Sequence, residues 1–395
     1  MNFKKIISLL LIFVFVFALF SCEKEKVQYK NTSFAYFDTV TTVIGFEASE
    51  KEFTRVSGEA VKLLGEYHRL YDIYNEYEGI VNICTLNKLV DGEHQKLTVD
   101  SKIIDMLLYA KEMYNKTNGK MNVAMGSVLS IWHDYRTAGL DDPSKAELPP
   151  MDLLKEASLH TDINNLIIDE ENSTVYIADP KMTLDVGAVA KGYAVEMVAK
   201  YLKELGKNNY VLNVGGNIRT TGVKATGEKW QAGVESPDED GSYIAYIELD
   251  DQASVTSGSY QRYYSAVVSA KCSKCQWVYD QELGIPELGI DPGTPPSSLG
   301  TAIKCPLCDA RLRRTSKQLH HIIDPTTLMP AEGFLSVSLI CKSSADGDCL
   351  STALFCMSLE DGMKLVDSLE GVEALWVTDD GEIHYSKNYK DYCYK

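Results

Sequence analysis

Two cysteine pairs, Cys272–Cys275 and Cys305–Cys308, constrain the fold of this chain more than any other feature. Each pair has the spacing C-x2-C, which allows two thiolates from one tight turn to bind the same metal ion. The 29 residues between the pairs let both turns meet around one ion in a tetrahedral site of four sulfur ligands. The sequence therefore predicts a small module that binds iron or zinc.

The residues around these cysteines resemble a rubredoxin, a small one-iron electron carrier. The resemblance rests on the spacing and on Trp277–Asp280, Gly289–Thr294 and Pro306. Rubredoxins usually have glycine after each second cysteine, where this chain has Gln276 and Asp309. We therefore expect strained turns around the metal, and a structural zinc ribbon is the alternative interpretation.

The first 22 residues resemble a bacterial lipoprotein signal. A basic start precedes the apolar stretch Ile6–Phe20, and Ser21 precedes Cys22. The apolar stretch is short for a membrane-spanning helix. We expect lipidation at Cys22, a polar tether over 23–31 and a location on the extracytoplasmic face of a bacterial cell membrane. A signal anchor with an incidental cysteine is the alternative.

Composition indicates an ordinary globular protein, with 45% apolar and 24% charged residues. The formal net charge of −17 argues against nucleic acid as a partner, because binding to phosphate groups requires a basic surface. The length of 395 residues allows two or three domains.

Hydrophobic periodicity predicts an α+β fold with one internal insertion. Helices are expected over 52–73, 101–115, 188–205, 348–357 and 359–369. Strands are expected over 39–46, 209–213, 230–235, 243–249, 254–257, 335–340 and 374–378, with a hairpin over 166–177.

Four short motifs have residue types suited to chemistry. Leu184–Ala194 leads from a strand into a helix whose N-terminus attracts phosphate. Asn213–Ile218 contains two glycines that permit close approach of backbone to a ligand. His320–Pro325 offers a histidine as general base, and Asp348–Phe355 places two oxygens four residues apart on one helix face. Each motif alone is also compatible with a purely structural turn or cap.

Taken in order, these motifs resemble the ApbE family, the FAD:protein FMN transferases. Thr256–Tyr260 and Gly119–Trp132 also match the family pattern. The resemblance covers about 32–265 and 317–395. It implies a T-fold-like α+β enzyme that uses Mg²⁺ to cleave FAD. FMN is moved to a Thr or Ser hydroxyl of an acceptor protein, and AMP leaves.

The resemblance also implies roles for individual residues. Asp348, Thr352 and the carbonyl of Ala188 are expected to bind Mg²⁺, and His321 is expected to be the catalytic base. Residues expected to bind the flavin substrate are Phe37, Tyr74, Asn122, Val123, Ala124, Asp185, Lys191, Gly215, Gly216, Ser257 and Gly258. The chain departs from the family at Phe37–Thr39, where Met-Gly-Thr is usual, and at Met121–Ala124, where Phe-Asp-x-Thr is common.

The metal module interrupts this resemblance over 266–316. In the family a short hairpin occupies this place, so we expect the module to replace the tip of that hairpin. Two other functions remain open. One is a lipoprotein that retains FAD and passes electrons between flavin and iron, and the other is a protein that hydrolyses or stores FAD.

Overall fold

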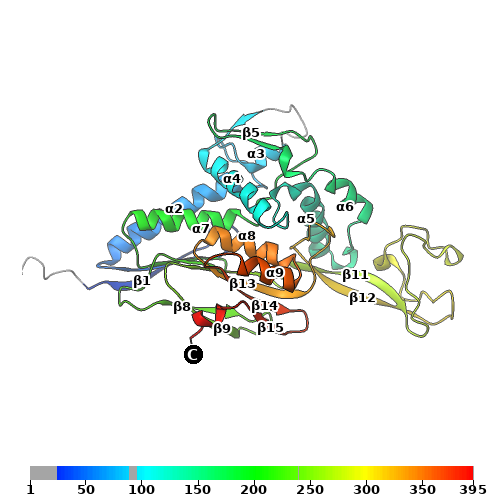
Figure 1. The fold of residues 1–395 in the computed structure, drawn as a ribbon. Coiled ribbons are helices and arrows are strands. Elements are labelled where there is room, and N and C mark those ends of the chain that lie inside the picture. The colour runs from blue at the N-terminus through cyan, green and yellow to red at the C-terminus, as the bar shows by residue number, and fades with distance from the viewer. Residues whose placement is uncertain (1–24, 89–95, 239, 395) are drawn as a thin grey trace, which may run out of the picture.

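The centre of the molecule is an antiparallel sheet of eight strands in the order β1-β2-β6-β7-β10-β13-β14-β15 (Figure 1). This computed structural model describes residues 25–88, 96–238 and 240–394, so the expected signal over 1–22 and the lipidation site Cys22 lie outside the described residues. The strands are β1 (Val27–Ser33), β2 (Thr41–Glu47), β6 (Tyr210–Val214), β7 (Asn217–Thr220), β10 (Ala253–Gly258), β13 (Phe334–Cys341), β14 (Glu373–Thr378) and β15 (Ile383–Tyr385). None of the described helices has the length and apolar character needed to span a membrane.

Four helices cover one face of this sheet (Figure 1). They are α2 (Glu50–Tyr71), α7 (Ala190–Glu204), α8 (Ser344–Phe355) and α9 (Leu359–Asp367). Helix α2 begins with an N-cap, in which the Ser49 hydroxyl accepts a hydrogen bond from the backbone N–H of Glu52. Helix α8 packs on β10 and β13, and Val255, Leu339 and Leu350 are among the buried residues of this main core.

The opposite face of the sheet is covered by a hairpin of β8 (Trp230–Glu235) and β9 (Tyr243–Leu249). Trp230 and Ile247 form a second core there with Ile340 and Leu375 from the central strands. Because both faces are covered, β13 is buried along nearly its whole length. Its two serines, Ser336 and Ser338, are buried as well, so this strand has no polar face toward solvent.

A smaller upper part packs above α2 and α7 (Figure 1). It consists of α3 (Ile83–Lys88), α4 (Ser101–Lys116), β3 (Leu97–Thr98), β4 (Leu166–Asp169) and β5 (Thr174–Ile177). The predicted hairpin over 166–177 is confirmed as β4 and β5. Two helices that sequence periodicity did not reveal, α5 (Gly126–Asp141) and α6 (Met151–Ser158), lie beside this part.

The structure corrects two sequence expectations. Val27–Ser33 is not part of a tether, because it pairs with β2 along its full length and forms the edge strand of the sheet. Helix α8 begins at Ser344 rather than at Asp348, because the Ser343 hydroxyl caps it by accepting from the backbone N–H of Asp346. Asp348 therefore lies in the second turn of the helix.

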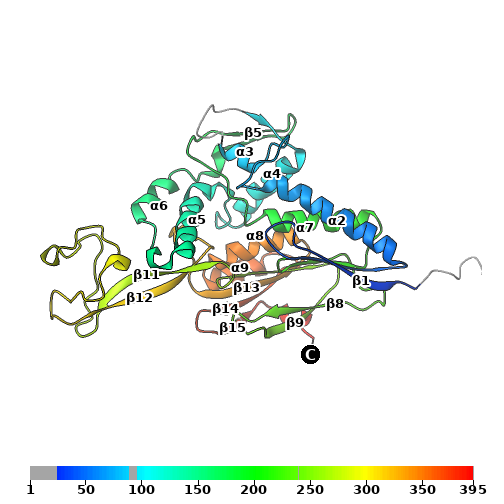
Figure 2. The same cartoon turned by 180° about the vertical axis from the view of Figure 1, so that it is seen from behind.

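The metal module is held away from the core at the end of a two-stranded ribbon (Figure 2). The ribbon consists of β11 (Tyr263–Cys272) and β12 (Leu312–His320), paired in antiparallel register. Ala266 packs with Trp132 in a core shared with α5, whereas Ala270 packs with Tyr279 in a separate core of the module. We call residues 273–311, which lie beyond the ribbon, the distal lobe.

Candidate functional site

The residues expected to bind Mg²⁺ lie where helices α7 and α8 cross. Oδ2 of Asp348 accepts a hydrogen bond of 2.7 Å from the backbone N–H of Gly192. Glycine is required at this crossing, because a Cβ atom there would lie 2.4 Å from the Cβ of Asp348. Nζ of Lys191 lies 3.8 Å from Oδ1 of the same carboxylate. The crossing thus joins a carboxylate, a cation and the N-terminus of α7.

The oxygen atoms at this crossing fit a hard divalent cation. Asp348 is only 7% exposed; burial raises the pKa of its carboxyl group, and the charge of Lys191 opposes this. The hydroxyl of Thr352 donates to the backbone oxygen of Asp348 at 3.2 Å, which leaves its lone pairs for another partner. In the described part of the chain, no hydrogen bond is donated to the carbonyl of Ala188, in the turn before α7. Carboxylate, hydroxyl and carbonyl oxygens are ligands that Mg²⁺ accepts.

Strand β10 brings Ser257 and Gly258 against α8. The hydroxyl of Ser257 lies 2.8 Å from that of Ser351, the residue before Thr352. A Cβ atom at Gly258 would meet the ring of Tyr260 at 2.6 Å, so this glycine makes room for an aromatic neighbour.

Gly215 and Gly216 form the two-residue turn of the β6–β7 hairpin. Their φ angles of +56° and +83° suit the left-handed turn that such hairpins favour. A Cβ atom at Gly215 would also lie 2.4 Å from Oγ1 of Thr39. The nearby Phe37 has a φ of +58°, and its ring packs edge-on against His68 at 5.4 Å between centroids. Phe37 and Thr39 precede β2. Asn217, the residue after Gly216, connects this turn to the α7–α8 crossing, because its side-chain oxygen accepts a hydrogen bond from the Ser344 hydroxyl of α8.

A second group of side chains surrounds Asp185, in the turn before α7. The Tyr74 hydroxyl lies 3.2 Å from Nδ1 of His133, and Nε2 of His133 lies 3.7 Å from Oδ2 of Asp185. Burial lowers the pKa of His133, and the charge of Asp185 opposes this. Burial also raises the pKa of Tyr74. The negative charge of Asp185 raises this pKa further, and the positive charge of Arg136 lowers it. The structure therefore places Tyr74 and Asp185 in one group, with His133 between them.

The segment over 122–124 lies directly beside Asp185. The backbone N–H of Asp185 donates to the carbonyl of Val123 at 2.8 Å. The side chain of Asn122 accepts from the N–H of Ala124 and donates to the carbonyl of Thr161. Val123 and Ala124 are buried in the main core, so their side chains have no free surface for a ligand.

The two adjacent histidines have different surroundings. Both ring nitrogens of His320 are used within the protein: Nε2 lies 2.8 Å from the carbonyl of Ala331, and Nδ1 accepts from the N–H of Ile322. In His321 only Nδ1 has a partner among the described residues, the carbonyl of Arg262 at 3.3 Å. This bond requires the proton on Nδ1 and leaves Nε2 as an acceptor.

His321 is also held in its neutral form. Burial, and next the charge of Arg262, lower its pKa to about 3, with smaller contributions from His320 and Arg136. A general base must be unprotonated before it can act. His321 is thus neutral and has a free nitrogen, and a pKa this low makes it a weak base in the protein without bound substrate.

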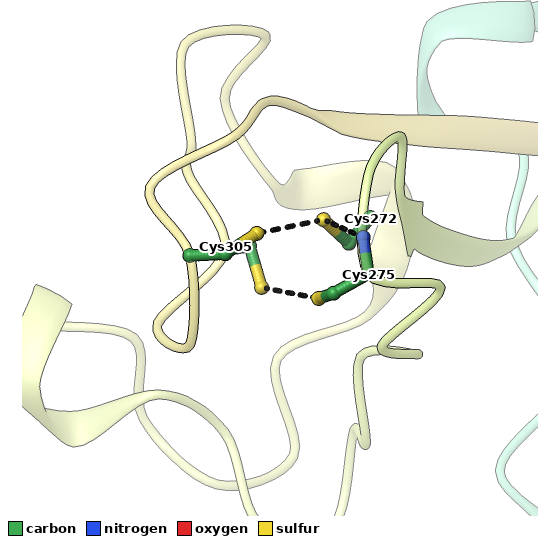
Figure 3. A group of neighbouring side chains, drawn as sticks. Cys272, Cys275 and Cys305 are labelled. Atoms are coloured by element: carbon green, nitrogen blue, oxygen red, sulfur yellow. Dashed lines mark hydrogen bonds between the residues drawn. The ribbon is translucent and has the colours of Figure 1, made fainter.

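The four cysteines, Cys272 at the end of β11 and three in the distal lobe, converge as the spacing predicts. Figure 3 shows the sulfur atoms of Cys272, Cys275 and Cys305 facing one another. All four sulfur ligands lie within 4.8 Å of one another, with 3.4 Å between Cys272 and Cys308 and 3.6 Å between Cys275 and Cys305. A tetrahedral ion with metal–sulfur bonds of about 2.3 Å has sulfur–sulfur edges of about 3.8 Å. The site therefore fits one tetrahedral metal ion.

Backbone groups prepare this site for a metal. Burial opposes ionisation of Cys272. Hydrogen bonds from the backbone N–H groups of Cys275 and Lys274, and then from the thiols of Cys308 and Cys275, lower the pKa of the Cys272 thiol to about 6. The expected strain is also present: Gln276 and Asp309 have φ angles of +64° and +59°, in the region that glycine prefers.

A cavity of about 860 Å³ lies apart from these sites, between the end of α4, the loop after β12 and the end of α8. Lys120, Asp324 and Phe355 are among its lining residues. None of the residues expected to bind FAD or Mg²⁺ lines it.

Sequence reasoning missed three residues near Asp185 and His321. His133 and Arg136 lie on α5, and Arg262 directly precedes β11. The only available signal was their position inside or beside matched segments, Gly119–Trp132 and Thr256–Tyr260. Their proximity depends on tertiary packing between α5 and β11, which no local pattern reveals.

The fold and the four-sulfur site define an α+β protein with a rubredoxin-like insertion. The chain belongs to the ApbE family, whose family model matches residues 37–286 and 309–376. A rubredoxin family model matches residues 269–315, at the place of the distal lobe.

Curated relatives support this placement. The FAD:protein FMN transferase of Klebsiella pneumoniae (strain 342) is 24% identical over 322 residues, which cover 80% of this chain and 83% of the relative. The protein of that name from Treponema pallidum (strain Nichols) is 26% identical over 310 residues, covering 75% and 70%.

Solved structures share the fold. The ApbE protein of Thermotoga maritima superposes with a TM-score of 0.69 at 22% identity, over 93% of this chain and 100% of that chain. The flavin transferase ApbE of Vibrio cholerae gives a TM-score of 0.64 at 22% identity, over 93% and 99%.

Proposed function

We propose that this protein is an FAD:protein FMN transferase that uses Mg²⁺ and releases AMP. The observation that carries the proposal is the α7–α8 crossing, where a buried carboxylate, Lys191 and free backbone groups meet. Family membership and the names of the relatives support the same activity. The acceptor is a redox protein with a target Thr or Ser hydroxyl.

The residues divide the chemistry between two places. Asp348, Thr352 and the Ala188 carbonyl would hold Mg²⁺, which when bound would neutralise charge on the diphosphate of FAD. Lys191 adds a fixed positive charge at the N-terminus of α7, where helices attract phosphate. His321 accepts the proton of the acceptor hydroxyl at Nε2, because Nδ1 already donates to the carbonyl of Arg262.

The group transfer balances as one substitution at phosphorus. The hydroxyl oxygen forms a bond to the phosphorus of the FMN half of FAD, and the bond from that phosphorus to the bridging oxygen breaks. The electron pair leaves with AMP, and the hydroxyl proton moves to His321. Tyr74, 62% exposed at the edge of the Asp185 group, is free to cover the flavin ring.

The location of the enzyme follows from the sequence alone and is part of the proposal. Lipidation at Cys22 would attach the protein to the outer face of the bacterial cell membrane. The strand Val27–Ser33 leaves only a few residues between lipid and sheet. The active site would therefore work close to the membrane surface, and the acceptor would be an extracytoplasmic redox subunit.

For the distal lobe we propose that it holds iron and recognises the acceptor. The ten residues of β11 separate Cys272 from the His321 region, which is about 30 Å at the usual rise per strand residue. This distance favours a docking role over electron exchange with a flavin bound at His321. Metal analysis of protein from iron-replete native cells tests the assignment, since zinc alone would indicate a structural ribbon.

The measurement of AMP release from FAD, with and without an acceptor protein, separates the three functions considered. A transferase releases AMP in proportion to acceptor modified, and Asp348→Ala abolishes this release. Release without any acceptor would indicate an FAD hydrolase. Retention of intact FAD with no AMP would indicate an electron carrier.

A further inference from the structure

Two arginines near His321 have no carboxylate partner. Arg136 on α5 is half-buried, and Arg262 is exposed at the root of the ribbon. In the described part of the chain, neither guanidinium takes part in an ion pair within 4 Å or donates a side-chain hydrogen bond. The buried Arg219 differs, because it pairs with Glu196 at 2.8 Å and Asp251 at 2.9 Å.

The two arginines lie on elements that pack together at this point. Trp132 of α5 and Tyr264, two residues after Arg262, share one core, and a Cβ atom at Gly139 of α5 would lie 2.7 Å from the Tyr264 ring. Burial lowers the pKa of Arg136, and the charge of Arg262 lowers it further, while Tyr74 and Asp185 oppose this. Both arginines also disfavour protonation of His321. A partly buried cation that faces a second cation is unfavourable in the free protein unless an anion joins them.

The groups around this pair leave it with excess positive charge. His321 and His133 both have lowered pKa values, so neither adds a charge near neutral pH. Asp185 is the acidic residue that acts on both Tyr74 and Arg136. Asp38 acts on the neighbouring Tyr74 and Asp134 on His133. Because no carboxylate of the described residues lies within ion-pair distance of either guanidinium, a further anion can still join the two.

We propose that Arg136 and Arg262 form a phosphate-binding pair that holds the phosphoryl group to be transferred beside His321. This inference rests on the proposed function and adds two residues to it. The guanidinium group suits the role, because its planar fork donates two parallel hydrogen bonds to phosphate oxygens. As the hydroxyl oxygen bonds to phosphorus and the bridging bond breaks, the pair balances charge on the phosphoryl oxygens.

The position of Arg262 gives this pair a second role. Its backbone carbonyl accepts the hydrogen bond from Nδ1 of His321, while its side chain would hold the phosphoryl group. One residue therefore orients the base and the group that the activated hydroxyl attacks. An anion bound to the pair would also raise the pKa of His321, because it offsets the nearby positive charges.

Binding of inorganic pyrophosphate, measured by calorimetry without Mg²⁺, tests the pair directly. We expect Arg136→Gln and Arg262→Gln each to weaken binding at least tenfold, with Arg262→Lys intermediate. Arg55→Gln is the matched control, because Arg55 pairs with Glu52 and Glu59 on the exposed face of α2. Equal binding by wild type and both glutamine variants would overturn the proposal.

A second measurement follows the His321 ring by NMR during a pH titration. Pyrophosphate should raise the pKa of His321 in the wild type and in Arg55→Gln, and raise it less in Arg262→Gln. Arg262 is exposed, so its replacement is not expected to prevent folding. Equal shifts in all proteins would refute the pair.

Failure of this inference is separable from failure of the proposed function. If pyrophosphate binding depends on the arginines but FAD yields no AMP, the phosphate site stands and the transferase activity does not. If AMP release proceeds at the wild-type rate in both glutamine variants, the transferase stands and the arginine pair does not.

Discussion

Gly192 offers a sharp test of the α7–α8 crossing. In Gly192→Ala the new Cβ would start 2.4 Å from the Cβ of Asp348 and 2.5 Å from the carbonyl oxygen of Ser344. Ordinary carbon contacts begin near 3.5 Å, so the helices must separate by about 1 Å. Overpacking of this kind costs roughly 1–3 kcal/mol, against a gain of about 0.5–1 kcal/mol for alanine over glycine in a helix.

Gly192→Ala should reduce the rate of AMP release more strongly than it reduces the stability of the protein. The same separation weakens the hydrogen bond from Gly192 to Asp348 and moves the carboxylate relative to Lys191. A misplacement of about 1 Å can reduce the rate by roughly 100-fold. The assay is AMP release at saturating FAD and Mg²⁺, together with denaturant unfolding to compare stability.

Gly58→Ala is the matched control. Gly58 lies within α2, and a Cβ atom there would meet nothing within 4 Å. The same substitution should therefore stabilise the protein by about 0.5–1 kcal/mol and leave AMP release unchanged. If Gly192→Ala matches Gly58→Ala in both stability and rate, the close crossing is not needed for activity.

Three further predictions concern the base, the lobe turns and the lobe itself. His321→Ala should lose FMN transfer yet still bind FAD. His320→Ala should mainly lower stability, because both ring nitrogens of His320 form hydrogen bonds within the protein. If His320→Ala lowers FMN transfer more than His321→Ala, the base is misassigned. Gln276→Gly should stabilise the lobe by about 1 kcal/mol in thermal unfolding, because it removes a left-handed strain, and a lower midpoint would contradict this. Replacing residues 273–311 with a short glycine-containing turn should preserve FAD binding, because the matched family motifs lie outside that span. Flavin fluorescence measures this binding. If the shortened protein does not bind FAD, the distal lobe is part of the FAD site.

Local patterns predicted the parts of the site that depend on short spacing. The i, i+4 placement of Asp348 and Thr352 and the C-x2-C pairs needed only helix or turn geometry. The glycine pair at 215–216 was expected to permit unusual backbone angles, and its positive φ angles confirm that property. The left-handed angle at Gln276 likewise follows from glycine being usual at that position in rubredoxins.

The remaining features depend on contacts between distant segments. His133 and Asp185 approach only because α5 packs beside the turn before α7. Residues 27–31 were predicted to be part of a polar tether over 23–31, since an exposed edge strand carries little apolar signal. The start of α8 was missed because its cap, Ser343, precedes a helical turn that contains Gly347 and little apolar periodicity.

Intact-mass spectrometry of an acceptor tests the central claim most directly. A redox protein of the proposed acceptor class, from the same organism, would be incubated with this protein, FAD and Mg²⁺, and AMP would be quantified in the same sample. The account predicts that the acceptor gains the mass of one FMN residue on a Thr or Ser, with one AMP released for each, and that Asp348→Ala gives neither product. Release of AMP and free FMN in equal amounts, with the acceptor mass unchanged, would contradict it.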